Sequence, residues 1–138
     1  MDKIIFKIVK PQGIVYESEI DKITIPTEAG EITVLPDHSP LVSVVSAGEL
    51  LVHKGKDIIA MAVSGGILEI RPESELYILA DTAELATEIN IERAEEARQR
   101  AEKLLKEQKN VEDIEFTKIQ ALMEKELNRI SIAKKYRK

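Results

Sequence analysis

The feature that most constrains the fold of this chain is a change in hydrophobic periodicity near residue 88. Up to residue 82, apolar residues form short runs separated by Gly, Pro or acidic residues, a pattern typical of β-strands. Beyond residue 88, apolar residues recur every three or four positions, as they do on one face of a helix. We therefore predict two domains, a strand-rich one over residues 1–87 and a helical one over residues 88–138.

The strand-rich part consists of short apolar runs with turn residues between them. Seven or more strands at this spacing favour an antiparallel sandwich or barrel. No helix long enough for a parallel crossover connection lies between the runs. The runs, in chain order, are KIIFKIVK, IVYESEI, DKITIP, EITVL, LVSVV, ELLVHK, DIIAMAV, GILEIRP and ELYILAD.

The helical part reads as two amphipathic helices with a break at residues 106–110. Asn90 can cap the first helix, whose first turn carries Glu92, and Asn110 with Asp113 can restart the second. The short break predicts an antiparallel hairpin. The expected contact stripes are Ala94, Ala97, Ala101, Leu104 and Leu105 on the first helix, and Phe116, Ile119, Met123, Leu127, Ile130 and Ala133 on the second.

The first of these stripes is rich in alanine. Each alanine buries little apolar area, so the stripe adheres weakly to whatever it packs on. A hairpin that can undock and a hairpin that stays tightly packed are both compatible with this pattern.

Charge and composition limit the classes of function. Residues 1–87 carry 7 Lys and Arg against 14 Asp and Glu, whereas residues 88–138 carry 13 against 11, which suggests two regions facing different partners. An acidic chain with three Tyr, two Phe and no Trp argues against binding of single-stranded nucleic acid. The absence of Cys excludes thiolate nucleophiles and zinc–thiolate sites. The start, MDKIIFKIVK, lacks the pattern of a signal peptide, and the longest apolar run, IIAMAV, is too short to span a membrane, so we expect a soluble protein.

The stretch VLPDHSP, residues 34–40, places Asp37, His38 and Ser39 side by side. A catalytic triad needs the histidine to reach the serine oxygen while the carboxylate orients the opposite ring nitrogen. Three consecutive residues rarely meet that geometry because adjacent side chains diverge. The flanking prolines favour a rigid connection between strands, so we predict a structural turn.

Other candidate sites are weaker. The glycines of VSGGILEI, residues 63–70, lack the Lys-Ser/Thr ending of a phosphate loop and the spacing of a dinucleotide fingerprint, so they indicate a tight turn or a bulge. His53 has no second histidine nearby, so a metal site there is not expected. The charged run at residues 92–109 reads as the solvated face of a helix. We therefore expect no self-contained enzyme.

Four motifs together carry a resemblance to a known family. In chain order they are GEITVLPDHSPLVSVVSAGEL (30–50), AVSGGILEIRP (62–72), INIERAEEARQRAE (89–102) and LNRISIA (127–133). The chain resembles the epsilon subunit of bacterial F-type ATP synthases from one end to the other. In that family the stretch like VLPDHSP is a strand connection, in agreement with the geometric argument above.

The resemblance implies a ten-stranded flattened antiparallel β-sandwich followed by an antiparallel two-helix hairpin. The sandwich would bind the gamma subunit and sit on the c-ring. The protein would be a non-catalytic rotor subunit in the central stalk of a proton-translocating enzyme, coupling ring rotation to the catalytic head. The hairpin would extend among the alpha and beta subunits to inhibit ATP hydrolysis. The implied location is peripheral, at the cytoplasmic face of the bacterial plasma membrane, with no membrane insertion, no nucleic acid and no required cofactor.

In several bacteria the docked hairpin of this family binds ATP as a regulatory ligand, through a motif beginning Ile/Leu-Asp, then two residues, then Arg-Ala. The chain departs from it at Asn90, where the ATP binders have aspartate. Asparagine keeps the capping role but lacks the charge and two of the acceptor sites of a carboxylate, so we expect weak or absent ATP binding. The nucleotide site implied by the resemblance comprises Glu84, Ile89, Asn90, Arg93, Ala94 and Arg100.

Three hypotheses from different classes follow. The first is the rotor subunit with an inhibitory hairpin. The second is a free-standing ATP-binding sensor with no role in the rotor. The third is a small hydrolase that uses Asp37, His38 and Ser39. Copurification with a gamma subunit distinguishes the first from the others, and a hydrolase assay of the isolated protein tests the third.

Overall fold

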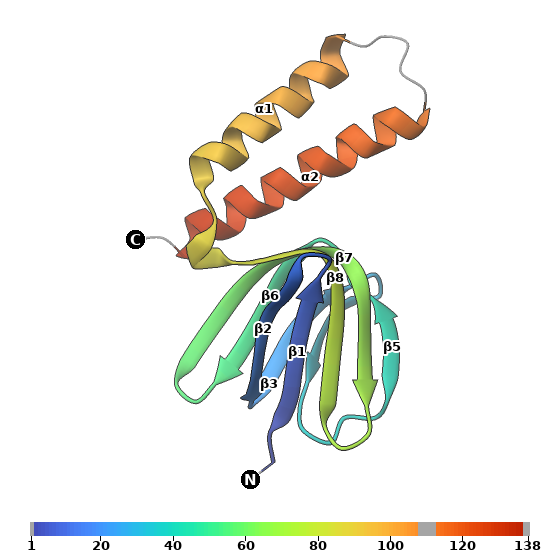
Figure 1. The fold of residues 1–138 in the computed structure, drawn as a ribbon, viewed down its shortest axis with the longest axis vertical. Helices are drawn as coiled ribbons and strands as arrows, with labels where there is room; N and C mark the ends of the chain where they lie inside the picture. The colour runs from blue at the N-terminus through green and yellow to red at the C-terminus, as the bar shows by residue number, and fades with distance from the viewer. Residues whose placement is uncertain (1, 108–112, 137–138) are drawn as a thin grey trace. The chain divides into compact units, whose positions relative to one another are not determined.

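In the computed structural model the described part of the chain, residues 2–107 and 113–136, forms eight β-strands followed by a 3-10 turn and two α-helices (Figure 1). The strands are β1 (Ile4–Lys10), β2 (Gly13–Ile20), β3 (Lys22–Thr27), β4 (Gly30–Val34), β5 (Leu41–Val44), β6 (Gly48–Lys54), β7 (Asp57–Arg71) and β8 (Glu75–Leu85). The turn η1 spans Ala86–Glu88, and the helices are α1 (Ile91–Glu107) and α2 (Asp113–Tyr136).

These elements belong to two compact units. The sandwich unit comprises Met1–Leu85 and the helical unit comprises Ala86–Lys138. Ala86 and Thr87, which the sequence assigned to the first domain, fall in the helical unit because they lie in η1, which contacts α2.

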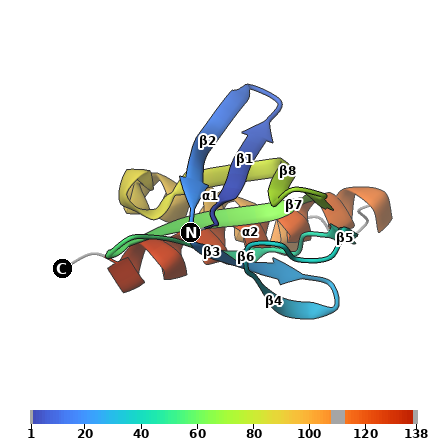
Figure 2. The same ribbon diagram turned by 90° about the horizontal axis from the view of Figure 1, so that it is seen from below.

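The strands pair in the order β2-β1-β8-β7-β6-β3-β4, with β5 also pairing with β7. In the first layer, β1 pairs with residues 75–79 of β8 and β5 pairs with residues 67–70 of β7. In the second layer, β6 pairs with residues 57–63 of β7, and β3 and β4 continue outward (Figure 2). Each layer holds five strand segments. Eight strands are observed where ten were expected. The difference arises because β7 and β8 each run through both layers, so that each forms one strand segment in each layer.

The strand β7 bends where it passes between the layers. The sequence predicted two strands, DIIAMAV and GILEIRP, but they form one strand that continues through two glycines. Met61 and Val63 are buried before the bend, whereas Leu68 and Ile70 are buried after it. The inward-facing positions thus change from odd to even numbers, as expected where a strand leaves one layer for the other.

Only glycine suits the bend. Gly65 and Gly66 have φ values of 70° and 124°, in the region that side-chain-bearing residues rarely adopt. A Cβ atom at Gly66 would lie 2.2 Å from the carbonyl oxygen of Leu79, and one at Gly65 would lie 2.3 Å from Oδ2 of Asp81. The glycines therefore permit the close approach of β7 to β8.

Six of the seven strand pairs that the described residues form are antiparallel, as predicted, and one is parallel. The parallel pair is β1 with β8, in which Phe6 lies opposite Leu76 and Ile8 opposite Ile78. A parallel pair needs a long connection, and here the rest of the sandwich unit supplies it. The expectation of a wholly antiparallel sandwich was wrong at this pair because it considered only connections between consecutive strands.

The core of the sandwich unit lies between the layers and is almost wholly aliphatic. Phe6 is fully buried and its ring tilts against Tyr16, with 6.0 Å between the ring centroids. The other large side chains that are fully buried in this unit are Ile4, Ile8, Ile20, Ile23, Ile25, Leu50, Met61, Leu68, Leu76 and Ile78.

A carboxylate joins two turns at one end of the sandwich unit. Oδ2 of Asp21 accepts a hydrogen bond of 2.6 Å from the backbone N–H of Gly55, and Oδ1 accepts one from Nζ of Lys3. The backbone N–H of Asp21 donates to the carbonyl of His53 at 2.8 Å. The hydrogen bonds from Lys3 and Gly55 lower the pKa of Asp21 below its ordinary value. Asp21 thus holds the β6–β7 turn against the connection between β2 and β3.

In the helical unit, α1 and α2 pack side by side as an antiparallel hairpin (Figure 1). The predicted stripe of α1 is confirmed at Ala94 and Ala101, which are buried, but Leu104 is 42% exposed. At 100° per residue, Leu104 lies about 80° from Ala94, at the flank of the stripe. The predicted cap at Asn110 lies outside the described residues.

The contact stripe of α2 follows a heptad pattern that differs in part from the predicted one. Ile130 and Ala133 are buried, as expected, and Ile119 and Met123 are half-buried. The stripe passes through Glu126, which is buried. Phe116 and Leu127, predicted to lie in the stripe, are 45% and 47% exposed. Leu127 projects from the flank of the stripe, one residue beyond Glu126, whereas Phe116 keeps the heptad spacing but lies in the first turn of α2.

Candidate functional site

The first turn of α1 carries most of the residues that the sequence assigned to a nucleotide site. Oδ1 of Asn90 accepts a hydrogen bond of 3.0 Å from the backbone N–H of Arg93, and the Asn90 carbonyl accepts one of 3.1 Å from Ala94. Asn90 is therefore the N-cap of α1, as predicted. The side-chain NH₂ group of Asn90, a hydrogen-bond donor, takes no part in the cap.

Within the helical unit the structure brings together five of the six predicted residues. Ile89 and Ala94 are fully buried, so they hold the first turn of α1 in place. Arg93 and Arg100 are exposed, and their spacing of seven residues places them two helical turns apart on one face of α1. The sixth residue, Glu84, lies in β8 of the sandwich unit, where it pairs with Ala62.

A hollow of about 630 Å³ adjoins this cap, lined by Glu88, Ile89, Asn90, Ile91 and Glu92. Two of its five lining residues are carboxylates, which repel polyphosphate. The exposed arginines Arg93 and Arg100 do not line it. The hollow itself is therefore poorly suited to a nucleotide, and any clamp for phosphate on α1 would come from the two arginines.

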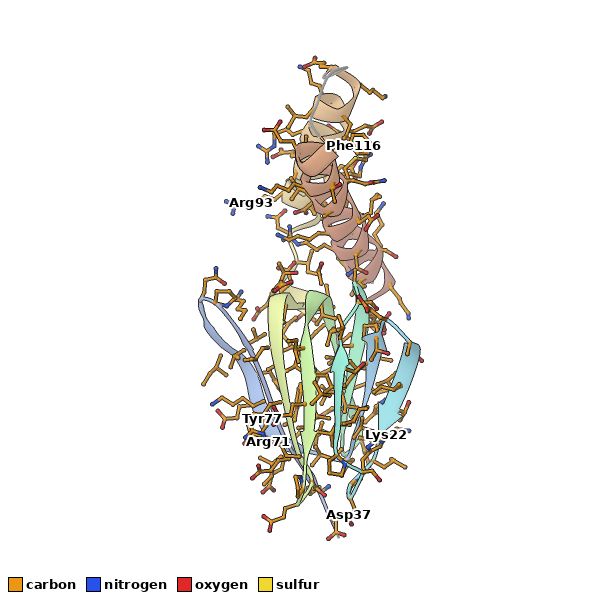
Figure 3. All side chains as sticks on the ribbon, turned by 90° about the vertical axis from the view of Figure 1, so that its right-hand side faces the viewer. Lys22, Asp37, Arg71, Tyr77, Arg93 and Phe116 are labelled. Atoms are coloured by element: carbon orange, nitrogen blue, oxygen red, sulfur yellow. The ribbon has the colours of Figure 1, made fainter. Side chains whose placement is uncertain are left out.

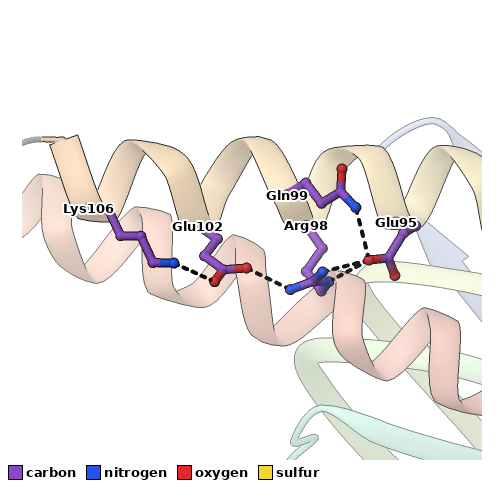
Figure 4. Close-up of polar contacts among 5 residues, drawn as sticks. All are labelled: Glu95, Arg98, Gln99, Glu102 and Lys106. Atoms are coloured by element: carbon purple, nitrogen blue, oxygen red, sulfur yellow. Dashed lines mark hydrogen bonds and ion pairs between the residues drawn. The ribbon is translucent and has the colours of Figure 1, made fainter.

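A network of charged side chains runs along α1 (Figure 4). Arg98 donates to Oε1 of Glu95 at 2.5 Å and to Oε2 of Glu102 at 2.8 Å, and Lys106 donates to Oε1 of Glu102 at 3.1 Å. The hydrogen bond from Arg98 lowers the pKa of Glu95, and those from Lys106 and Arg98 lower the pKa of Glu102. This network was not predicted from the sequence, although spacings of three and four between opposite charges indicate it.

The stretch VLPDHSP forms the turn that the sequence predicted. The backbone N–H of His38 donates to the carbonyl of Leu35 at 3.2 Å, which closes a β-turn with Pro36 at its second position. Asp37, at the third position, has a φ of 65°. A positive φ at this position, after proline, is typical of a type II turn.

The three polar side chains of this turn do not form a triad. Nδ1 of His38 donates to the carbonyl of Ser39 at 2.7 Å, and Oδ1 of Asp37 accepts from Oγ of Ser74 at 3.2 Å. Oγ of Ser74 in turn accepts a hydrogen bond of 2.8 Å from the backbone N–H of Asp37. The carboxylate is thus engaged with a second turn, 72–74, and the hydrolase geometry is absent from this site.

An exposed apolar row crosses the outer side of the first layer. In register across five strands it consists of Ile14, Val9, Leu79, Ile67 and Val44, on β2, β1, β8, β7 and β5. Four of these side chains are between 44% and 62% exposed, and Val9 is half-buried. We call this set the apolar row. The apolar row was not predicted from the sequence, although the runs on these strands are apolar at adjacent positions and so have no polar face.

A charged and aromatic cluster lies beside the apolar row. The Arg71 guanidinium lies 4.3 Å from the centroid of the Tyr77 ring and pairs with Glu69 on the same strand (Figure 3). Glu69 lies opposite Val42, which is 69% exposed. The hydrogen bond from Arg71 to Glu69 raises the pKa of Arg71. Tyrosine and arginine next to exposed aliphatic side chains are typical of protein interfaces.

Residues 2–107 and 113–136 lack two further features. These residues gather no group of three or more His, Asp or Glu side chains that could hold a metal ion. Over the same part of the chain, no helix is both long and apolar enough to cross a membrane.

A β-sandwich with an apolar row on its outer side, followed by a helical hairpin, defines a class of module that works through contacts with other proteins. Two family models match the chain, the β-sandwich domain of the ATP synthase delta/epsilon chain over residues 3–86 and its long α-helix domain over residues 87–134. The chain belongs to this ATP synthase delta/epsilon family.

Its relatives include bacterial proteins named ATP synthase epsilon chain. The one from Halalkalibacterium halodurans is 40% identical over 126 residues, which cover 91% of this chain and 93% of the relative. The one from Dehalococcoides mccartyi strain BAV1 is 38% identical over 138 residues, which cover 100% of this chain and 97% of the relative.

Two solved structures share the fold. A chain of the Euglena gracilis mitochondrial ATP synthase matches with a TM-score of 0.73 and 22% identity, covering 97% of this chain and 82% of that one. A chain of the Tetrahymena thermophila mitochondrial ATP synthase, from a structure of its central stalk and c-ring, matches with a TM-score of 0.61 and 12% identity, covering 97% and 96%.

Proposed function

We propose that this chain is a non-catalytic rotor subunit in the central stalk of a proton-translocating bacterial F-type ATP synthase. The sandwich unit binds the gamma subunit and sits on the c-ring, so that it turns with the ring. The complex holds the chain at the cytoplasmic face of the plasma membrane, without inserting it. Membership of the delta/epsilon family and the bacterial epsilon chains among its relatives support this proposal.

The apolar row is the observation that carries the proposal. Complete burial of a Leu or Ile side chain contributes about 1.5–3 kcal/mol, so covering the four half-exposed side chains of the row contributes about 3–6 kcal/mol. A contiguous apolar surface of this kind marks a protein interface. The proposed occupant is the gamma subunit.

Two substitutions on the same strand test this assignment. Ile67, in the row, and Ile58, outside it, both lie on β7 and are 51% and 60% exposed. Ile67→Asp should weaken binding of the full chain to purified gamma subunit about 100-fold or more, because an unpaired carboxylate at an interface costs several kcal/mol. Ile58→Asp is the matched control and should bind as the natural chain does. Equal binding by both variants, or a loss confined to Ile58→Asp, would show that gamma binds another surface.

The helical unit has a regulatory role in this proposal. The hairpin leaves its closed state, extends among the alpha and beta subunits and inhibits ATP hydrolysis. The small side chains of its seam, Ala94, Ala97 and Ala101, support this role because they give little adhesion between the helices. A chain cut after Thr87 should keep ATP synthesis in the reconstituted enzyme and raise ATP hydrolysis. Unchanged hydrolysis by an enzyme that has bound the truncated chain would contradict the inhibitory role.

ATP is proposed as a weak regulatory ligand of the hairpin. The single oxygen of the Asn90 side chain is engaged in the cap, whereas an aspartate would offer a second, charged oxygen to an N–H or O–H donor of the base or ribose of ATP rather than to its phosphates. A hydrogen bond to a charged group is worth about 1.5–3 kcal/mol, so Asn90→Asp should tighten ATP binding by roughly 10- to 100-fold. Arg93→Ala should abolish binding. Calorimetric titration with ATP, with and without Mg²⁺, measures both changes. Equal affinity of the natural chain and the two variants would contradict the proposed nucleotide site.

A further inference from the structure

Glu126 occupies an unexpected place in the hairpin. It is 3% exposed and lies in the contact stripe of α2, between Met123 and Ile130. The heptad spacing of this stripe directs it toward α1, whose buried side chains are the alanines Ala94 and Ala101. A carboxylate thus stands where a helical hairpin normally has an aliphatic side chain.

The ion-pair partner of Glu126 lies three residues further along the same helix. Nη1 of Arg129 donates to Oε2 of Glu126 at 2.7 Å, and the Arg129 side chain is 21% exposed. Since both residues belong to α2, this ion pair does not connect α2 to α1. The pairs made by Arg98, Lys103 and Lys106 likewise join residues of α1 to one another.

This geometry gives the ion pair different energies in the two states of the hairpin. In the closed hairpin the Glu126 carboxylate is removed from water while the Arg129 side chain stays 21% exposed, and burial of the charged carboxylate carries a desolvation penalty that its ion pair offsets only in part. In an open hairpin the same pair can persist within α2 while water solvates it. We infer that the Glu126–Arg129 pair favours opening of the hairpin and lets it open as two intact helices, an inference that rests on the mobility proposed above.

A cysteine placed in the seam measures opening directly. The chain has no natural Cys, so Ala101→Cys, at a buried position of α1, introduces a single thiol. Its rate of labelling by a thiol reagent, relative to an unfolded peptide, gives the fraction of open molecules. In this background the double substitution E126L/R129M should slow labelling about tenfold, because apolar replacement of a buried pair stabilises the closed state.

The control removes an exposed ion pair within one helix, which here lies on the surface of α1. Lys103 and Glu107 lie 3.8 Å apart on α1, with side chains 73% and 61% exposed. The substitution K103M/E107L should leave the labelling rate within about twofold of the parent. Labelling of E126L/R129M that is as fast as in the parent, or faster, overturns the inference. If that variant does not fold, E126Q/R129Q replaces it, because glutamine is similar in size but carries no charge. This variant should also slow labelling, and an unchanged labelling rate would overturn the inference.

The outcome is separable from that of the proposed function. Labelling uses the isolated full chain, whereas the inhibitory role is tested by ATP hydrolysis after truncation at Thr87. Slower labelling with unchanged hydrolysis would support the role of the ion pair and contradict inhibition by the hairpin. Raised hydrolysis with unchanged labelling would support inhibition by the hairpin and contradict the role of the ion pair.

Discussion

Replacement of Gly66 by alanine tests the bend that carries β7 from one layer of the sandwich to the other. The new Cβ atom would lie 2.2 Å from the Leu79 carbonyl oxygen and 2.8 Å from Cα of Ala80, both backbone atoms of β8. Overlap of this kind in a packed region costs about 1–3 kcal/mol. A φ of 124° adds about 1–3 kcal/mol for any residue other than glycine. We therefore expect Gly66→Ala to lower the free energy of unfolding by about 2–6 kcal/mol, a large part of the 5–15 kcal/mol typical of a domain.

The matched control is Gly55→Ala, in the β6–β7 turn. Gly55 also has a positive φ, of 60°, but an added Cβ would meet nothing within 4 Å. Its cost is confined to the left-handed backbone, about 1–2 kcal/mol. The difference between the two variants therefore reports the close approach of β7 to β8, together with any extra backbone cost at a φ of 124° compared with 60°.

Urea unfolding followed by tyrosine fluorescence measures both variants. The chain has three tyrosines, of which Tyr16 and Tyr77 lie in the sandwich unit and Tyr136 in α2. A Tyr136→Phe background confines the signal to the sandwich. If Gly66→Ala and Gly55→Ala lose the same free energy of unfolding, the contact at the bend does not constrain the sandwich and the reasoning fails.

Three further changes have defined outcomes. Asn90→Ala should lower the stability of α1 by about 1 kcal/mol, measured as loss of helical circular dichroism on heating, because the N-cap bond is lost. Ser74→Ala should raise hydrogen exchange at the backbone N–H of Asp37, which would lose its acceptor, and an unchanged exchange rate would contradict this. The pKa of Asp21 is lowered in the folded state, so its contribution to stability is present above about pH 4 and is lost as the pH falls through the folded value. Asp21→Asn should therefore flatten the loss of stability on acidification, and a profile as steep as that of the natural chain would show that Asp21 does not cause it.

Local signals in the sequence predicted the elements well. The N-cap at Asn90 follows from a side chain that can bond the third residue of the helix, and the structure confirms it. The turn at Leu35–His38 follows from two prolines and a good turn former, and it is also confirmed. Both predictions depend on residues that are close in the chain, where backbone and side-chain preferences act directly.

The sequence failed where distant residues decide the outcome. The glycines of VSGGILEI predicted a tight turn or a bulge, but Gly65 and Gly66 bend a single strand whose pairing with β8 keeps its register on both sides of Gly65. The burial of Glu126 was not predicted, because a charged side chain gives no local sign that it packs between two helices. The bond from Ser74 to Asp37 joins residues 37 positions apart, and no local pattern specifies it. The apolar row likewise appears only when the register of five strands is known.

The course of β7 and β8 through both layers has a mechanical consequence. In a sandwich whose layers touch only through side chains, one layer can slide over the other by repacking the core. Here such sliding would shear two continuous strands and break the backbone hydrogen bonds of their ladder, so the resistance to shear is far greater. A force applied to the β5 side of the domain therefore passes to the β3–β4 side through the main chain, and a body of this stiffness transmits torque without absorbing it in deformation.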